Sequence, residues 1–296
     1  RVQKDCRIIG LSVKEVVTKY RSDILVCTIE RGDEAHIANG DFVFEEKDVV
    51  SFVASPKNAN DFFVKIGYKG HSVKNALVVG GGVITHYLCE ILERSKISLK
   101  IVEKDRKLCE ELSAQWHKTD VIHGNAADRE LLVETGIEKS DAFLALAELD
   151  EENILLSVYA KGVGKGKVVT KINRIDYDNV VSRLDLDTTI CPKNITSDII
   201  LRYVRAMKNT LGSNVETLYN IIQDKVEASE FIVRENSPIA GIPLAQLKFK
   251  KDVLIASITR GDTVIVPRGH DVIQAGDAVV IVSKQIGLHD VTDVLK

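Results

Sequence analysis

Residues 75–92 read "NALVVGGGVITHYLCEIL", an apolar strand-like run that leads into three glycines and then into a helical pattern. Strand, glycine turn and helix in this order are typical of a dinucleotide-binding unit, in which the backbone approaches a phosphate at the helix N-terminus. Thr85 stands where that pattern has its third glycine. The helix is predicted from apolar residues that recur at spacings of three and four: Ile84, Tyr87, Leu88, Ile91 and Leu92.

The sequence around this stretch alternates between strand-like and helical patterns. Asp128 is the expected N-cap of one helix, which Gly136 closes, and Asp150 starts another, which Gly162 closes. Strands and helices that alternate with short connections predict a doubly wound, Rossmann-like parallel sheet covered on both faces. The strand-like runs lie at 76–79, 99–103, 120–123, 141–147, 167–172 and 187–191.

An acidic residue supports a nucleotide site. Glu103 ends the second predicted strand, 23 residues after Gly80, where a carboxylate accepts hydrogen bonds from ribose hydroxyls. Its charge disfavours a 2′-phosphate, so NAD or an adenine nucleotide is expected rather than NADP. The alternative is a solvated acid at a strand end. We expect Thr85 to hold its helix further from the strand than a glycine would, which predicts a weaker or differently posed ligand.

An internal repeat flanks the predicted sheet. Residues 23–53 align without gaps to residues 252–282, and eleven of the 31 positions are identical. In both copies a strand-like run leads to Arg-Gly-Asp, whose glycine and aspartate predict a tight hairpin turn rather than an adhesion signal. The chain therefore divides into a β-rich module at 1–66, a nucleotide-binding domain at 75–211 and a second β-rich module at 216–296.

Composition and spacing exclude several classes of function. With 40 basic against 43 acidic residues, the net charge of −3 offers no positive excess for nucleic acid. No apolar run is long enough for a membrane span and no signal peptide is visible, so we expect a cytosolic protein. The chain does not begin with Met, and we expect it to start inside a longer natural protein. No metal site or acid–base pair is expected; His123 could touch a ligand, but a structural role is preferred.

A long helix is predicted at about 194–211, after the last strand. Its apolar stripe packs either on its own sheet or on a partner subunit, and the sequence leaves both possibilities open. Because so wide a stripe is rarely left in water, we predict at least a dimer. The stripe consists of Ile195, Ile199, Ile200, Tyr203, Val204, Met207 and Leu211.

Several motifs together resemble a known family. The segments "ALVVGGGVITHYL", "LKIVEKD", "VIHGNAADRELLVETGIEKSDAFLALAELDEENI" and "VVTKINR" resemble the nucleotide-binding RCK domain, the regulator of potassium conductance. The flanking repeats, with "FIVRENSPIAG" at 231–241, resemble the C-terminal RCK module. Tandem copies of both are similar to the TrkA-type regulators of Trk potassium uptake. Their N–C–N–C order implies that this chain holds the end of the first C module and the whole second half.

The resemblance implies binding residues but no catalytic or metal-binding residues. Relative to the family pattern, Val83 replaces an arginine, Thr85 a glycine and Asn125 an aspartate, which implies weaker binding or a copy with a structural role. The implied cofactor-binding residues are Gly80 and Gly82 at the phosphates, Val83 and Ile84 next to them in the chain, Glu103 at the ribose, Asn125 and Ala126 flanking the adenine, and Ala147, Glu148 and Lys171 at the phosphates.

The resemblance also implies a function. The chain would belong to a cytosolic regulatory subunit that binds NAD(H) or ATP/ADP and gates a Trk-type potassium transporter. It would act as a homo-oligomer bound peripherally at the inner face of the cell membrane. The alternatives are an NAD-dependent oxidoreductase and a structural RCK half with a vestigial site. A dehydrogenase needs a substrate domain that carries an acid or a base, and the duplicated modules show none, so we expect no enzyme.

Overall fold

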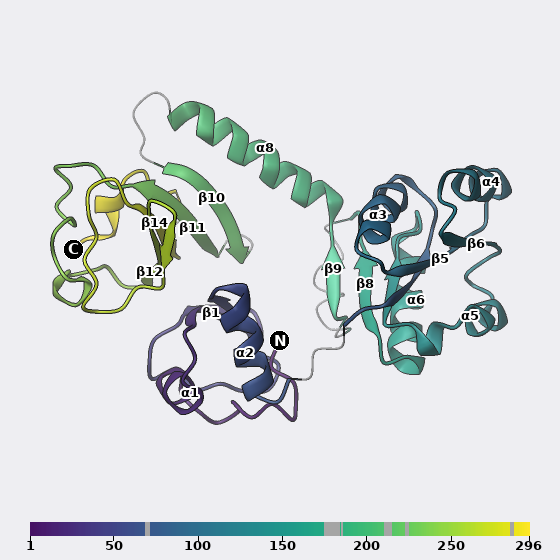
Figure 1. Ribbon diagram of the computed structural model, residues 1–296, viewed down its shortest axis with the longest axis horizontal. Helices are drawn as coiled ribbons and strands as arrows, with labels where there is room; N and C mark the ends of the chain where they lie inside the picture. Colours follow the sequence, from purple (N-terminus) through teal and green to yellow (C-terminus); the bar gives the residue numbers. More distant parts are fainter. Residues whose placement is uncertain (69–71, 175–183, 185, 210–214, 223–224, 285–286) are drawn as a thin grey trace. The chain divides into compact units, whose positions relative to one another are not determined.

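The computed structural model describes residues 1–68, 72–174, 184, 186–209, 215–222, 225–284 and 287–296 (Figure 1). The chain forms two compact units. We call Arg1–Gly70 together with Asp198–Lys296 the repeat unit, and His71–Ser197 the sheet unit. Helix α8 (Pro192–Asn209) runs from one unit into the other, so the unit boundary falls inside the helix that the sequence predicted.

The sheet unit contains six parallel strands in the order β6-β5-β4-β7-β8-β9 among the described residues. The predicted Rossmann-like fold class is confirmed. The order reverses between β4 and β7, and in doubly wound sheets ligands bind at the carboxyl ends of the strands beside such a switch point. The strands are β4 (Asn75–Val79), β5 (Ser98–Glu103), β6 (Thr119–His123), β7 (Ala142–Ala145), β8 (Lys167–Lys171) and β9 (Thr188–Ile190).

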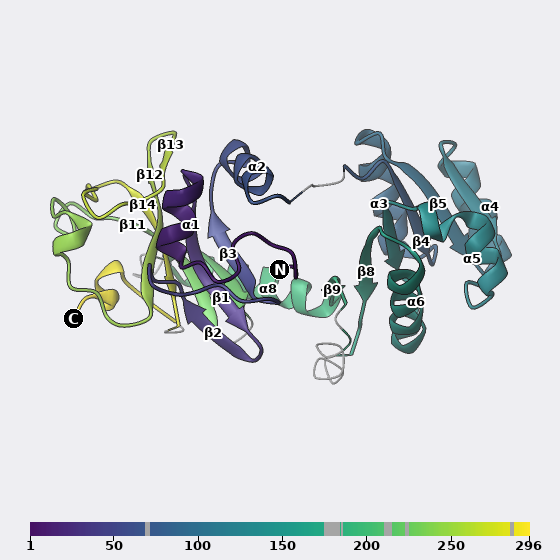
Figure 2. The same cartoon turned by 90° about the horizontal axis from the view of Figure 1, so that it is seen from below.

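Helices cover both faces of this sheet because side chains alternate along each strand. Ala76 and Val78 pack with α3 (Val83–Arg94) and α4 (Arg106–Gln115). Leu77 and Val79 pack with α5 (Arg129–Thr135) and α6 (Asp150–Val163) on the other face (Figure 2). A short 3₁₀ turn, η1 (Ile137–Lys139), follows α5.

The predicted helix ends are confirmed with one exception. Asp128 caps α5 by accepting from Glu130 N, and Gly136 ends that helix with a φ of 92°. Helix α6 starts at Asp150 as expected, but Gly162 does not close it. The helix continues to Val163 and is capped by Gly164, because the backbone of Gly164 still bonds to Ala160 at 2.8 Å.

The first module of the repeat unit has a three-stranded antiparallel sheet in the order β2-β1-β3. Val16, Phe44 and Phe62 lie in its core. Glycine 32, with a φ of 59°, begins the two-residue turn between β1 and β2, so the predicted hairpin is confirmed. The elements are α1 (Val13–Tyr20), β1 (Leu25–Arg31), β2 (Glu34–Ile37), β3 (Val49–Val53) and α2 (Pro56–Lys65).

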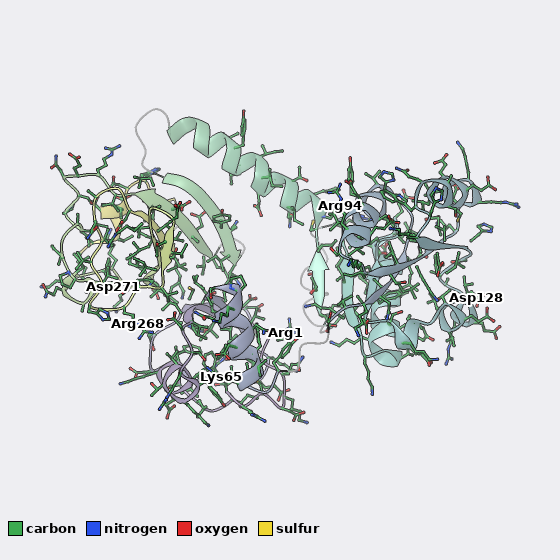
Figure 3. The ribbon with its side chains drawn as sticks, viewed as in Figure 1. Arg1, Lys65, Arg94, Asp128, Arg268 and Asp271 are labelled. Atoms are coloured by element: carbon green, nitrogen blue, oxygen red, sulfur yellow. The ribbon has the colours of Figure 1, made fainter. Side chains whose placement is uncertain are left out.

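The second module has a five-stranded antiparallel sheet in the order β10-β11-β14-β12-β13. Its hairpin repeats that of the first module, since Gly261 has a φ of 57° between β12 and β13. Arg268 donates its backbone N–H to the Asp271 carboxylate at 2.7 Å beyond this hairpin (Figure 3). The elements are β10 (Val215–Ile222), β11 (Val226–Ile232), η4 (Leu244–Gln246), β12 (Val253–Arg260), β13 (Thr263–Ile265), β14 (Ala278–Ser283) and η5 (Val291–Val294).

The two modules share a core within the repeat unit. Cys27 and Ala35 of the first module pack with Ala256 and Val282 of the second. Lys225 adds a polar tie by donating to the carbonyl of Asp33 at 2.7 Å. The duplicated modules therefore bury apolar surface against each other inside one chain. Across the described part of the chain, no helix has both the length and the apolar character needed to cross a bilayer.

Candidate nucleotide-binding site

A cavity of about 420 Å³ lies at the carboxyl ends of the parallel strands, beside the switch point. Its lining combines the glycine turn after β4, the end of β5, the loop after β6 and the ends of β7 and β8. Val83 and Ile84 do not line it, and their side chains are 74% and 36% exposed. Eight residues singled out from the sequence do line it: Gly80, Gly82, Glu103, Asn125, Ala126, Ala147, Glu148 and Lys171.

Gly80 and Gly82 of the turn are glycines for different structural reasons. Gly80 has a φ of 99°, and a Cβ placed on it would lie 2.8 Å from the backbone N of Ala147. It therefore lets β4 and β7 approach each other at the switch point. Gly82 is the N-cap of α3, and a Cβ there would meet nothing within 4 Å. No side chain caps this helix, so its first N–H groups can serve an anion.

The structure gives Thr85 a different role from the one that the sequence suggested. Its side chain is fully buried, and its hydroxyl donates to the carbonyl of Gly80 at 2.5 Å. The threonine therefore ties the first turn of α3 to the glycine turn instead of merely separating helix and strand. The sequence could not show this, because the hydroxyl finds its acceptor only when the turn folds back on the helix.

Glu103 is buried, with 9% of its surface exposed, so it is not a solvated acid at a strand end. One carboxylate oxygen accepts from Gly81 N at 2.6 Å, and the other accepts from Asp105 N at 2.8 Å. These bonds join the glycine turn to the end of β5. A carboxylate oxygen has two lone pairs and can accept more than one hydrogen bond, so Glu103 can still accept from ribose hydroxyls.

Asn125 organises the loop after β6. Its side-chain oxygen accepts from Ala127 N at 3.0 Å, and its carbonyl accepts from Asp128 N at 3.0 Å. An aspartate at this position would form the same turn but would add a negative charge to the cavity.

The sequence reasoning missed Asn153. This fully buried side chain on α6 donates to the carbonyl of Ala147 at 2.9 Å and to that of Lys171 at 3.0 Å. It holds the ends of β7 and β8 together at the cavity edge. Asp150, Asn153 and Ser157 recur at helical spacing among the buried residues of α6, and this polar pattern was the signal available in the sequence.

Lys171 supplies a positive charge at the end of β8. Its ammonium donates to the carbonyl of Leu146 at 3.2 Å. Burial lowers the pKa of Lys171 from its ordinary value, and the nearby carboxylates of Asp150 and Glu148 counteract that shift.

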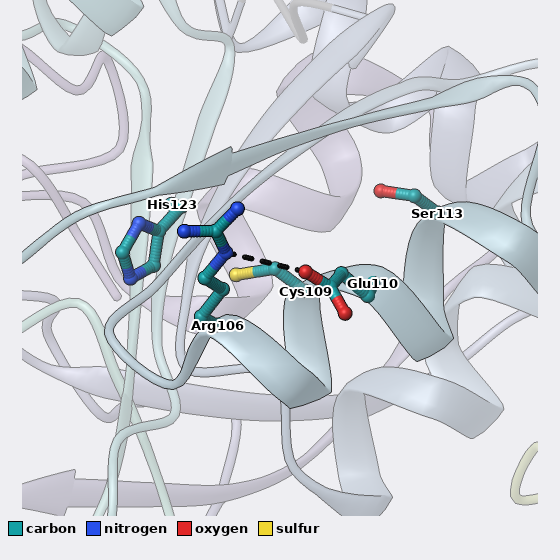
Figure 4. Close-up of a pocket in the computed structure, with 5 residues that line it drawn as sticks. All are labelled: Arg106, Cys109, Glu110, Ser113 and His123. Carbon is teal, nitrogen blue, oxygen red and sulfur yellow. Dashed lines mark hydrogen bonds and ion pairs between the residues drawn. The ribbon is translucent and has the colours of Figure 1, made fainter.

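His123 lies outside this cavity, in a more open pocket of about 590 Å³ formed by α4 and β6 (Figure 4). Its ring nitrogen is 3.1 Å from the carbonyl of Lys104, which fits the structural role preferred from the sequence. In the same pocket Arg106 pairs with Glu110 at 3.2 Å, and burial raises the pKa of the Cys109 thiol. Among the described residues there is no cluster of three metal-ligating side chains.

Comparison with known domains covers most of the chain. The TrkA-N domain matches residues 76–192, and the TrkA-C domain matches residues 1–67 and 228–296. The Trk system potassium uptake protein TrkA homolog 2 of Methanosarcina mazei is 28% identical over 100% of this chain and 64% of its own length. The Trk system potassium uptake protein TrkA of Halomonas elongata is 30% identical over 88% of this chain and 56% of its own length. The chain thus spans less than two thirds of these relatives.

Solved structures show the same fold. The GsuK channel aligns with 95% of this chain and 49% of its own, with a TM-score of 0.55 and 13% identity. A structure described as the GsuK channel bound to NAD covers the same shares with a TM-score of 0.54 and 13% identity. At this identity the likeness concerns the fold alone. On the domain matches and the relatives, the chain belongs to the family of proteins built from TrkA-N and TrkA-C domains.

Proposed function

We propose that this chain is part of a cytosolic regulatory subunit of a Trk-type potassium uptake system and that it binds NAD(H), or alternatively ATP or ADP. The observation that carries the proposal is the uncapped N-terminus of α3, which lies beside buried Glu103 at the switch point. A phosphate is stabilised by such a helix end, and a ribose by such an acid. The relatives named for Trk potassium uptake and the NAD-bound GsuK channel support it.

The residues at the cavity suit each part of a nucleotide. The backbone N–H groups from Gly82 onwards would hold the phosphates, and Glu103 would accept from the ribose. Asn125 and Ala126 line the cavity next to Glu103, where the adenine would lie. The charge of Glu103 opposes a 2′-phosphate, which favours NAD(H) over its phosphorylated form.

A regulatory role suits this site better than a reaction. The polar groups best placed for acid–base work, Glu103 and Lys171, already bind backbone partners. The nucleotide would act by binding one arrangement of the domains more tightly than another, because equal affinity for two states shifts nothing. In the cell the subunit would lie at the inner face of the membrane against the transporter's membrane subunit.

Helix α8 is the proposed contact between subunits. The apolar side chains of α8 that the structure describes include exposed ones, with an exposed fraction of 68% at Tyr203. This favours the partner-subunit alternative that the sequence left open. The side chain of Met207, and Leu211 as a whole, lie outside the described residues. The exposed members of the stripe are Ile195, Ile199, Ile200, Tyr203 and Val204, and Leu201 beside them is exposed as well.

Calorimetric titration with NAD, NADH, ATP and ADP tests the nucleotide proposal. Gly82→Arg should abolish binding while the fold persists, because Gly82 lines the cavity and a Cβ added there meets no atom within 4 Å. Gly162→Arg is the matched control, since a Cβ there also meets nothing and Gly162 is exposed outside the cavity. Unchanged binding by the Gly82 variant would remove the glycine turn from the site.

A test in cells addresses the transporter. The full-length protein with Gly82→Arg should still associate with the membrane subunit, but its potassium uptake should respond less to nucleotide. A normal response would show that this copy is structural and that the switch lies in the other half. Steady oxidation of NADH in the presence of a small carbonyl compound would instead favour the NAD-dependent oxidoreductase.

A further inference from the structure

Three buried polar atoms gather at the amino-terminal edge of the parallel sheet, away from the nucleotide cavity. They are the indole nitrogen of Trp116, one carboxylate oxygen of Glu93 and the hydroxyl oxygen of Thr119. None of the three has a partner at hydrogen-bond geometry among the residues that the structure describes. Thr119 as a whole is only 8% exposed. Buried polar groups in native proteins are nearly always hydrogen-bonded, so three exceptions in one place call for a common partner.

Cys89 shows that these side chains are neighbours. Its side chain on α3 is fully buried, one helical turn before Glu93, and burial raises the pKa of Cys89 to about 11. The charge of Glu93 adds to this rise and the adjacent Thr119 hydroxyl opposes it, so both groups lie close to the thiol. Trp116 packs against the same apolar cluster as Cys89. The Trp116 ring also lies 5.4 Å from that of His86, one turn earlier on α3.

The local backbone brings Trp116 and Thr119 to this place. Trp116 is the C-cap of α4, and its N–H donates to the carbonyl of Leu112 at 2.8 Å. The N–H of Thr119 donates to the carbonyl of Trp116 at 3.1 Å, which closes a tight turn from α4 into β6. Glu93 faces this turn from the last turn of α3. A molecule bound between the three side chains would therefore join α3, α4 and β6.

The hydrogen-bonding character of the three groups selects the kind of ligand. An indole N–H can only donate, an ionised carboxylate can only accept, and a hydroxyl can do either. The indole proton disfavours a cation at this place, and the carboxylate disfavours an anion. A small neutral molecule that both donates and accepts suits all three groups. Water has this character, and a buried water typically makes about three hydrogen bonds to polar groups that would otherwise be unsatisfied.

We propose that Trp116, Glu93 and Thr119 form an internal binding site for one ordered water molecule. The water accepts from the indole N–H, donates to the Glu93 carboxylate and bonds to the Thr119 hydroxyl. It fixes the C-terminal end of α3, the helix whose N-terminus lies at the nucleotide cavity. The inference does not depend on the nucleotide site, and either can fail without the other.

A high-resolution crystal structure of the protein tests the site directly. It should show a water at about 2.7–3.2 Å from the Trp116 nitrogen and from the Glu93 and Thr119 oxygens. A direct hydrogen bond between the indole and the carboxylate, or the absence of a water between the three groups, would overturn the proposal.

Thr119→Val tests the site in solution through the sign of its effect on thermal stability. Valine has nearly the shape of threonine but no hydroxyl. If the hydroxyl binds a water, its loss should lower the Tm by about 2–4 °C, as for one buried hydrogen bond in a domain of this size. If the hydroxyl has no partner, its removal should raise the Tm, because an unsatisfied buried polar group is relieved.

Thr170→Val is the matched control. Thr170 is fully buried in a strand of the same sheet, and its hydroxyl donates to the Ser157 hydroxyl at 2.8 Å. The Tm of this variant should fall because a satisfied hydroxyl is lost. A Tm of Thr119→Val that equals or exceeds that of the unaltered protein would overturn the water site.

Discussion

Two buried carboxylates show how the two units of the molecule differ. In the repeat unit Asp277, 1% exposed, accepts from the Arg260 guanidinium at 2.8 and 2.7 Å and from Gln274 N at 2.8 Å. In the sheet unit Glu103, 9% exposed, accepts from two backbone amides instead. A buried acid matched by its own cation serves the fold. A buried acid that accepts only from neutral amides beside a cavity still has oxygen lone pairs that can accept from a ligand.

The first module repeats the arrangement of the second at the aligned positions. Arg31 binds Asp48 through two hydrogen bonds of 2.8 and 2.9 Å, and Asp48 also accepts from Glu45 N at 2.8 Å. Arg31 has a further partner in the Glu45 carboxylate at 2.6 Å, where the second module has Gln274. The pair of arginine and aspartate is therefore the shared feature of the module, and the extra glutamate is peripheral.

The largest effect is expected from removing Asp277, the buried acid that pairs with Arg260. Asp277→Ala should lower the free energy of unfolding by about 3 kcal/mol, because it removes the carboxylate to which two Arg260 nitrogens and the Gln274 N–H donate. Urea denaturation measures the loss, and the exposed turn residue Asp262 provides the control, Asp262→Ala. Nucleotide affinity should not change. A loss no larger than that of the control would show that the pair contributes no stability.

The pH dependence sharpens the same point. Hydrogen bonds from the Arg260 side chain hold the pKa of Asp277 below its ordinary value, although burial opposes the shift. A lowered native pKa gives stability that is complete above the unfolded value of about 3.9 and is lost as pH falls through the native pKa. The difference in unfolding free energy between the unaltered protein and Asp277→Asn should be constant from about pH 5 to 8 and shrink below about pH 4. A difference in unfolding free energy that grows on acidification would contradict a lowered pKa of Asp277 in the folded protein.

In the sheet unit the glycine turn is bound by the Thr85 hydroxyl as well as by Glu103. Thr85→Gly should cost about 2–3 kcal/mol, because it removes a buried side chain and its hydrogen bond and places glycine within a helix. Thr85→Ser keeps the hydroxyl and should cost less. Thermal unfolding measures both. A stable Thr85→Gly protein that binds nucleotide more tightly would instead support the loosening expected from the sequence.

Removing Glu103, the buried acid that is held by backbone amides instead of a cation, should mainly weaken ligand binding. Glu103→Ala should weaken NAD binding by about 1–3 kcal/mol through the lost ribose hydrogen bonds. It also frees the N–H groups of Gly81 and Asp105, so affinity must be compared at a temperature where both proteins are folded. An affinity equal to that of the unaltered protein would exclude Glu103 from the ribose site.

The smallest effect is expected from the peripheral partner of Arg31. The Glu45 side chain is 61% exposed, and exposed ion pairs contribute little. Glu45→Gln gives the first module the residue that the second has, and it should change the free energy of unfolding by less than about 0.5 kcal/mol. A loss as large as that of Asp48→Ala would show that the two modules are held by different pairs.

Local chemistry made much of this molecule predictable. Strands, helices and the two hairpins follow from apolar spacing and from turn residues that act on their neighbours in the chain. The strand–glycine–helix order and the distance to Glu103 predicted residues that now line one cavity. The prediction for Gly162 was wrong because a glycine near a helix end also fits inside the last turn when a later residue, here Gly164, forms the cap.

The sequence by itself determined the class of each element, the duplication of the β-rich module and the edge of the sheet where a ligand would lie. Only the tertiary structure decided how buried polar groups pair. The acceptor of the Thr85 hydroxyl depends on how the glycine turn folds against α3, whereas the Lys171 carbonyl bound by Asn153 and the partner of Arg260 depend on which strands become neighbours. The last two pairings join residues 18 and 17 positions apart, and the backbone fixes the geometry of all three only once the surrounding fold has formed.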